Sequence, residues 1–154
     1  MTAAGVLVVG YDNPLRGDDG VGCSAAGLLA ADPRLEGATI LARHQLTPEL
    51  ATDIAGASLV VLVDASMDGG APGSVAVRFI QPRRDPPLSW SHHLDPAALA
   101  GLAGALYDRV PPMVLISVTG AAFADGDRLS PALQRALPEV VDRVARVVEK
   151  HADG

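Results

Sequence analysis

Residues 58–64 read SLVVLVD, and this stretch decides the fold that the rest of the chain must adopt. Five consecutive aliphatic side chains leave no polar face, which is typical of a strand buried on both sides in a parallel sheet. GVLVVG at residues 5–10 and MVLISV at residues 113–118 have the same character. Weaker strand signals lie at residues 39–42 (TILA) and at residues 74–79, where alternation predicts an antiparallel edge strand.

Helix signals separate these strands. Asp18 or Asp19 can cap a helix of small residues at about 20–31. Three further pairs place proline at the first helical position after a capping residue, namely Thr47-Pro48, Asp95-Pro96 and Ser130-Pro131. Pro138 is expected to kink or split the last helix. The alternation predicts a three-layer α/β/α fold, with a mostly parallel twisted sheet of about five strands and one antiparallel edge strand.

Composition narrows the class of function. The 154 residues contain no repeat or linker, so we expect one domain over residues 1–154. The formal net charge is -6, and the basic residues are scattered apart from Arg83-Arg84, which argues against nucleic-acid binding. The single cysteine, Cys23, cannot form a disulfide within the chain, and we see neither a signal peptide nor an apolar run long enough to span a membrane. We therefore expect a cytoplasmic protein that does not act on membranes.

Candidate site residues follow the predicted strands, because sites in open α/β sheets form beyond the carboxyl ends of the strands. Three groups of side chains meet this condition: Asn13 with the pair Asp18-Asp19 after the first strand, Asp64 after the third, and His92 with His93 before the helix that begins at Asp95-Pro96. Two carboxylates and an imidazole suit a divalent metal such as zinc or nickel, and three protein ligands leave positions open for water or substrate. From the residues alone, Asp18 is better explained as a helix cap, and a loop histidine is usually solvated.

Four segments resemble the hydrogenase maturation endopeptidases. They are VLVVGYDNPLRGDDGVG (6–22), LVVLVDASMDGGAPGSV (59–75), SHHLDPAALAGLAGAL (91–106) and LSPALQRALPEVVDRV (129–144). Each segment alone is a weak match. Because the four occur in the family's order over nearly the whole chain, the set is specific.

This resemblance implies a nickel-contacting and catalytic triad of Asp19, Asp64 and His92. His92 is preferred because Leu94 follows it as in the family's His-x-Leu, and His93 is the alternative. The implied function is a metal-dependent endopeptidase that removes the C-terminal extension of a nickel-iron hydrogenase large-subunit precursor after nickel insertion. The nickel is expected to come with the precursor and to serve as the recognition signal.

The resemblance also implies residues that contact the precursor. These are Asn13 and the motif His44-Gln45-Leu46, which resembles the variant associated with cytoplasmic bidirectional, NAD-linked hydrogenases. The chain departs from the family pattern at Asp12, where the second glycine of Gly-x-Gly-Asn is usual, and at residues 118–127 (VTGAAFADGD), where Gly-x-x-Pro-Glu/Ser is usual. Aspartate tolerates a positive φ less well than glycine. We expect His44-Gln45-Leu46 and the 118–127 change to alter the choice of partner rather than the chemistry.

Three other functions remain open. A nickel chaperone would use the same ligands and bind the precursor without shortening it. A receiver-like phosphoacceptor domain shares the fold class, but its acids directly follow the first strand, whereas seven residues separate Gly10 from Asp18 here. Such a domain also needs a lysine near the end of its fifth strand, and residues 113–119 have none nearby. A nucleotide-binding module is disfavoured because the glycines of residues 10–22 do not fit Gly-x-Gly-x-x-Gly.

Overall fold

A computed structural model describes residues 3–67, 69–83, 94–123, 126 and 128–153. In chain order the elements are β1 (Val6–Tyr11), the 3₁₀ turn η1 (Gly17–Gly20), α1 (Val21–Ala30), the 3₁₀ turn η2 (Pro33–Leu35), β2 (Thr39–Arg43), α2 (Leu50–Gly56), β3 (Leu59–Ser66), β4 (Val75–Phe79), α3 (Pro96–Tyr107), β5 (Met113–Thr119) and α4 (Pro131–Asp153).

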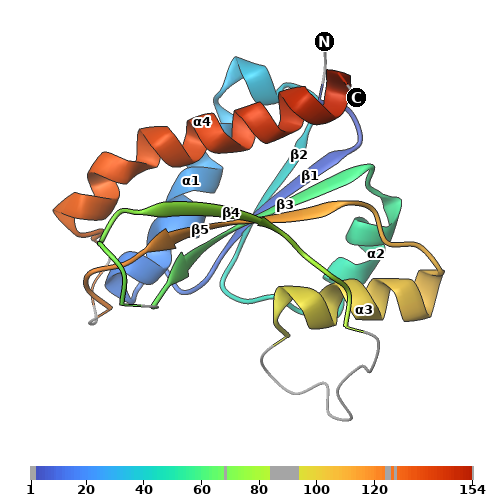
Figure 1. Cartoon of the computed structure of the whole chain (residues 1–154), viewed down its shortest axis with the longest axis horizontal. Helices are drawn as coiled ribbons and strands as arrows, with labels where there is room; N and C mark the ends of the chain where they lie inside the picture. The colour runs from blue at the N-terminus through green and yellow to red at the C-terminus, as the bar shows by residue number, and fades with distance from the viewer. Residues whose placement is uncertain (1–2, 68, 84–93, 124–125, 127, 154) are drawn as a thin grey trace.

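The five strands form one sheet in the order β2-β1-β3-β5-β4. Strands β2, β1, β3 and β5 are parallel, and β4 pairs with β5 in the antiparallel direction at the edge. Helices α1 and α4 cover one face of the sheet, and α2 and α3 cover the other (Figure 1). The predicted three-layer α/β/α fold with one antiparallel edge strand is confirmed.

Strand β3 occupies the centre of the sheet, as its sequence predicts. Val61 and Val63 point into the core beneath α1 and α4, whereas Val60 and Leu62 point into the core beneath α2 and α3. All four side chains are fully buried. Because both faces of this strand are covered over its first five residues, a polar side chain first gains access to solvent at Asp64, which begins the last three, half-buried residues of β3.

Two expected helix features differ in the structure. Helix α2 begins at Leu50, because residues 47–51 first form a turn in which the Leu50 N–H donates to the Thr47 carbonyl at 3.1 Å. Pro138 does not split the last helix, which runs without a break as α4. Buried side chains on both sides of this proline, including Leu133 and Val140, hold the helix against the sheet. Tertiary packing therefore outweighs the hydrogen bond that proline removes.

Two glycines allow α1 to approach the sheet backbone directly. A Cβ atom on Gly10 of β1 would overlap the carbonyl oxygen of Gly22 in α1. A Cβ atom on Gly22 would lie 2.6 Å from the backbone of Tyr11 and from the carbonyl oxygen of Val63. The first turn of α1, and η1 before it, therefore lie against the carboxyl ends of β1 and β3.

Replacing Gly22 with alanine is expected to lower the free energy of unfolding by at least about 2 kcal/mol, because the new methyl group meets fixed backbone atoms. Gly27 provides a matched control in the same helix, since it is exposed and a Cβ atom there would have no neighbour within 4 Å. Gly27→Ala should raise stability by about 0.5–1 kcal/mol. Urea unfolding of both variants checks this prediction, and a Gly22→Ala variant as stable as Gly27→Ala would contradict it.

Candidate functional site

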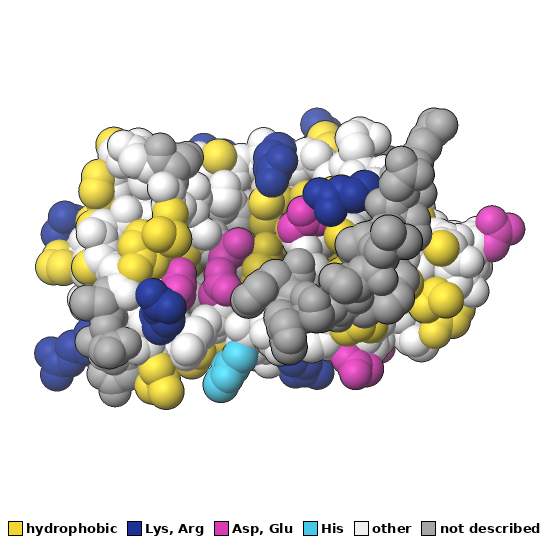
Figure 2. Space-filling model, turned by 90° about the horizontal axis from the view of Figure 1, so that it is seen from below, with side chains coloured by type: hydrophobic (Ala, Val, Ile, Leu, Met, Phe, Trp, Pro, Cys, Tyr) yellow, Lys and Arg dark blue, Asp and Glu magenta, His cyan; other side chains and the backbone are white. Residues whose placement is uncertain are grey.

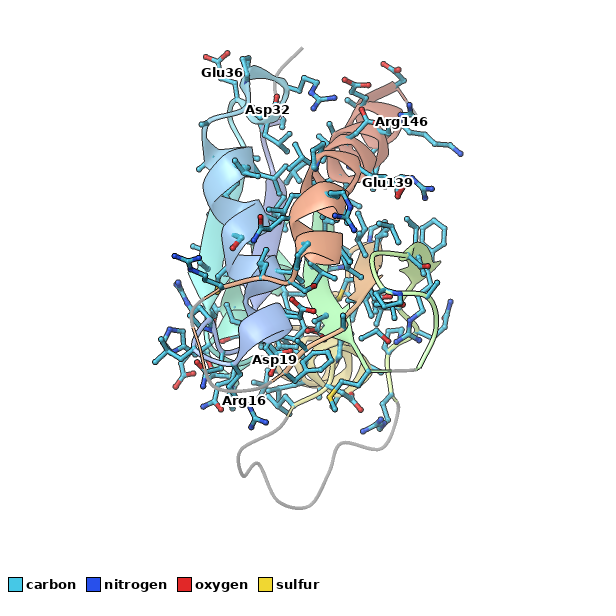
Figure 3. The ribbon with its side chains drawn as sticks, turned by 90° about the vertical axis from the view of Figure 1, so that its left-hand side faces the viewer. Arg16, Asp19, Asp32, Glu36, Glu139 and Arg146 are labelled. Atoms are coloured by element: carbon cyan, nitrogen blue, oxygen red, sulfur yellow. The ribbon has the colours of Figure 1, made fainter. Side chains whose placement is uncertain are left out.

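The candidate site lies at the carboxyl ends of β1 and β3. Gly10 and Val63 are register partners in these parallel strands, and the next residues along the two strands are Tyr11 and Asp64. Asp12 follows at the end of β1, and the loop after it leads to η1, which carries Asp19. Figure 3 shows Asp19 and Arg16 together at the end of α1 where the helix begins. The sequence prediction that Asp19 and Asp64 belong to one edge of the sheet therefore agrees with the topology.

Asp64 is a half-buried carboxyl group with an unsatisfied oxygen. Its Oδ1 atom is buried and has no hydrogen-bond partner among the described residues. Burial, followed by the neighbouring Asp12 carboxylate, raises the pKa of Asp64 far above its usual range, although the Tyr11 hydroxyl and the Ala65 amide act in the opposite direction. A carboxyl group in this environment gains from any cation that reaches it, because the cation favours the ionised form that burial penalises.

Asp19 is also half-buried, and only a weak ion pair stabilises its negative charge. Burial raises the pKa of Asp19, the charge of Asp12 raises it further, and Arg16 lowers it. The Arg16 Nε atom lies 4.0 Å from the Asp19 carboxylate, and the arginine side chain is 58% exposed. A single exposed ion pair of this kind contributes little. Asp19 therefore remains available to a cation supplied from outside.

Asp18 does not cap a helix, which corrects the reading of this residue from sequence. Its side chain is 0% exposed, and neither η1 nor α1 receives a side-chain cap. The carboxylate instead accepts hydrogen bonds from the Ala121 N–H at 2.6 Å, the Ala122 N–H at 2.9 Å, the Ser130 N–H at 2.6 Å and the Ser130 hydroxyl at 2.9 Å. We call these four hydrogen bonds the Asp18 clasp.

Main-chain hydrogen bonds extend the Asp18 clasp along the loop. The Gly17 N–H donates to the Gly126 carbonyl at 2.9 Å, the Gly126 N–H to the Leu15 carbonyl at 2.8 Å, and the Asp18 N–H to the Ala122 carbonyl at 2.7 Å. Burial alone would raise the pKa of Asp18, but the hydrogen bonds of the clasp outweigh it, so the pKa is lowered. The residue before Asp19 is thus an ionised anchor that fixes the acidic loop to the segment after β5.

Asn13 shapes the start of the same loop. Its Oδ1 atom accepts a hydrogen bond from the Leu15 N–H at 2.9 Å, and its carbonyl accepts one from the Arg16 N–H at 3.1 Å. The side chain is half-buried beside the site. A side-chain bond to the backbone two residues on is the turn chemistry that asparagine favours. Its predicted contact with a precursor stays a prediction.

The motif His44-Gln45-Leu46 follows β2, next to the end of β1. The Asp12 N–H donates to the Arg43 carbonyl at 3.1 Å, which joins the two strand ends. His44 and Gln45 are exposed at this edge, as a role in partner contact requires. Leu46 is only 4% exposed and packs in the core beneath α2 and α3. Most of this apolar side chain is therefore part of the core, and its predicted contact with a precursor stays a prediction.

His92 and His93 lie outside the described residues. Leu94, the next residue that the structure describes, is buried in the core. The carboxylate of Asp95 caps α3 by accepting a hydrogen bond from the Ala98 N–H at 2.8 Å. Figure 1 shows α3 running opposite to β5, so α3 begins on the side of the sheet where β5 ends. Within the described ranges, no three His, Cys, Asp or Glu side chains form a group that could hold a metal ion. The predicted third ligand, His92, thus stays a prediction.

Comparison with known proteins gives matches only at the level of structure. No protein-family model matches the sequence, and no curated protein matches it either. One similar solved structure is the [NiFe] hydrogenase maturation protease HycI from Thermococcus kodakarensis, with a TM-score of 0.72 and 21% identity over 94% of this chain and 92% of that chain. A second is the hydrogenase 2 maturation peptidase from a Thaumarchaeota archaeon, with a TM-score of 0.71 and 22% identity over 94% of this chain and 97% of that chain. A third is the hydrogenase maturating endopeptidase HybD from E. coli, with a TM-score of 0.67 and 20% identity over 94% of this chain and 92% of that chain. The chain has the fold of hydrogenase maturation proteases.

In this maturation-protease fold, the candidate site opens onto an exposed surface. Figure 2 shows acidic side chains close to one another on the lower face, with hydrophobic side chains beside them. Leu15, in the loop after β1, is 62% exposed, and Met67, directly after β3, is 75% exposed. Exposed apolar side chains next to polar groups are typical of a surface that binds another protein.

None of the helices in the described ranges has the length and apolar character needed to cross a membrane.

Proposed function

We propose that this protein is an endopeptidase that removes the C-terminal extension of a nickel-iron hydrogenase large-subunit precursor. The observation that carries the proposal is the buried Oδ1 atom of Asp64, which has no hydrogen-bond partner among the described residues and lies at the carboxyl edge of a maturation-protease fold. In the similar solved structures, the same fold belongs to proteins named as hydrogenase maturation proteases and endopeptidases. The resemblance of the four sequence segments supports the same reaction.

The residues of the site divide the proposed chemistry between them. Asp19 and Asp64, together with His92, would contact nickel that arrives bound to the precursor, and carboxylate and imidazole ligands suit this ion. The unsatisfied Oδ1 of Asp64 fits this role, because a cation supplies the partner that the protein does not. Nickel near the scissile bond would polarise its carbonyl group or activate a water molecule, and a site carboxylate would accept the proton.

Intact-mass spectrometry of precursors tests the proposed function. A nickel-loaded large-subunit precursor and a nickel-free one are each measured before and after incubation with the protein. We expect loss of a C-terminal peptide from the loaded precursor only. A stable complex without any loss of mass would instead indicate a nickel chaperone. If several precursors are neither cleaved nor bound, both the endopeptidase and the chaperone function are rejected, and the phosphoacceptor role becomes the next hypothesis to test.

His92 is expected to be the histidine of the site. His92→Ala should lower the rate of precursor cleavage by roughly a hundredfold, because one of three groups that contact the metal is lost. His93→Ala, its neighbour and natural control, should remain close to wild type. Cleavage rates from the mass-spectrometric assay check both variants. The assignment is wrong if His93→Ala abolishes cleavage while His92→Ala does not.

A further inference from the structure

Tyr11 places a polar hydroxyl group on a face of β1 that is otherwise apolar. It is the last residue of this strand, and like Leu7 and Val9 it packs in the core beneath α2 and α3. Its side chain is only 6% exposed. A phenylalanine would fill the same space. Packing therefore explains the ring of this residue, whereas the buried hydroxyl calls for a hydrogen-bond partner.

The strand register brings Tyr11 next to Asp64. Gly10 of β1 is the register partner of Val63 in β3. The residues that follow them, Tyr11 and Asp64, therefore occupy the next row of these two parallel strands. Side chains alternate along a strand, and Leu62 packs beneath α2 and α3, so Asp64 points to the same face of the sheet as Tyr11. There the Tyr11 hydroxyl forms a side-chain hydrogen bond with the Asp64 carboxyl group.

This hydrogen bond engages one carboxyl oxygen of Asp64 and leaves the other free. Oδ1 is buried without a partner among the described residues, so the bond from Tyr11 falls on Oδ2. The Asp12 side chain also forms a hydrogen bond with Asp64, but a carboxyl group donates only while it holds a proton. A tyrosine hydroxyl is a neutral donor and can bind the ionised carboxylate, which is the form that contacts a cation.

We propose that Tyr11 is a positioning residue, which holds the Asp64 carboxylate through Oδ2 and keeps its free Oδ1 atom available to the metal of the precursor. The inference rests on the proposed endopeptidase function and adds to it a residue outside the predicted triad. Because the hydroxyl is carried by a buried strand, it restricts rotation of the carboxylate. Loss of a hydrogen bond that orients a metal-contacting group typically lowers metal affinity or activity by about 10–100-fold.

Two tyrosine-to-phenylalanine variants of the full-length protein test the role of the hydroxyl. Tyr11→Phe removes the donor to Asp64 and keeps the buried ring. Tyr107→Phe is the matched control, because the chain has two tyrosines and the hydroxyl of Tyr107 also forms a side-chain hydrogen bond, at 2.7 Å to the Thr52 hydroxyl between α2 and α3. Each variant is measured for Tm and for the KM and kcat of precursor cleavage at a temperature well below Tm.

We expect Tyr11→Phe to lower kcat at least roughly tenfold, because the Asp64 carboxylate loses its fixed orientation. KM should stay within about twofold of the wild-type value, since the surface that binds the precursor is unchanged. Tyr107→Phe should match wild type in both constants. If the Tyr11 hydroxyl had only a structural role, Tyr11→Phe would lower Tm and leave the kcat of the folded protein unchanged.

A spectroscopic measurement tests the contact without cleavage. The ¹³C NMR resonance of the Asp64 carboxyl carbon is recorded in aspartate-labelled protein and identified by its absence from Asp64→Asn. We expect Tyr11→Phe to shift this resonance, because the carboxyl group loses a hydrogen bond. Tyr107→Phe should leave it in place.

An unchanged kcat or an unchanged Asp64 resonance in Tyr11→Phe would overturn this inference. The proposed function would still stand in that case, provided that the wild-type protein cleaves the nickel-loaded precursor. A wild-type protein that does not cleave the precursor would reject the endopeptidase function, and the positioning role that rests on it would be rejected as well.

Discussion

Replacing Asp64 with asparagine is expected to slow precursor cleavage by roughly a thousandfold while the fold stays intact. Asparagine has nearly the same shape, but it cannot carry the negative charge that would contact nickel and balance charge at the reacting carbonyl. Because burial and the Asp12 carboxylate oppose ionisation of Asp64 in the free protein, removing the carboxyl group should not reduce the free energy of unfolding. Loss of activity without loss of stability distinguishes a functional carboxylate from a structural one.

Asp53→Asn is the matched control for this prediction. Asp53 is an exposed aspartate in α2, and the same substitution there should leave the cleavage rate at the wild-type value. Mass spectrometry of the precursor gives the rate, and urea unfolding gives the stability of both variants. An Asp64→Asn variant that cleaves within tenfold of wild type would remove Asp64 from the reaction.

Replacing Asp18 with alanine is expected to lower the free energy of unfolding by about 4 kcal/mol, because three N–H groups and one hydroxyl, all in part-buried hydrogen bonds, lose their acceptor at once. The four donors come from Ala121, Ala122 and Ser130. Asp32 offers a comparison, since its carboxylate accepts from the Arg34 N–H at 2.9 Å at an exposed turn. Asp32→Ala should lower the free energy of unfolding much less than Asp18→Ala does, because the Asp32 hydrogen bond lies at an exposed turn.

The pH dependence of stability provides a second test of the Asp18 clasp. The folded protein lowers the pKa of Asp18, so the unfolded chain binds a proton at this residue more readily than the folded chain does. The contribution of Asp18 is therefore complete above the unfolded pKa of about 4 and is lost as the pH falls through the folded pKa. Urea unfolding between about pH 6 and pH 3 should show a smaller loss of stability for Asp18→Ala than for wild type. Parallel curves for the two proteins would show that the clasp does not hold an ionised carboxylate.

The layers and strands of the fold could be predicted because local sequence specifies them. Aliphatic, Val-rich runs such as SLVVLV are typical of a buried strand, and Asp95-Pro96 caps and starts α3 where predicted. The positions of Asp19 and Asp64 followed from topology, since the carboxyl ends of adjacent parallel strands share one edge.

Features that depend on distant contacts could not be predicted in this way. The acceptor role of Asp18 depends on donors beyond β5, so the acidic pair alone looked like a helix cap. Leu46 belongs to a motif with two exposed residues, and only the packing of α2 and α3 shows that its side chain faces the core. Pro138 was expected to kink or split its helix, and α4 is not split, because the apolar residues on both sides of the proline pack against the sheet.

The Asp18 clasp also sets the order in which the site is assembled as the chain is made. It joins residues separated by 103 to 112 positions, whereas β1 and β2 pair across a connection of fewer than forty residues. Contacts between such distant positions carry a larger entropic cost of loop closure and form late. On the ribosome, η1 cannot reach its final position before Ser130 has emerged. A nascent chain therefore carries the carboxylates before they have their final positions, and the candidate site is assembled only in the last stage of folding.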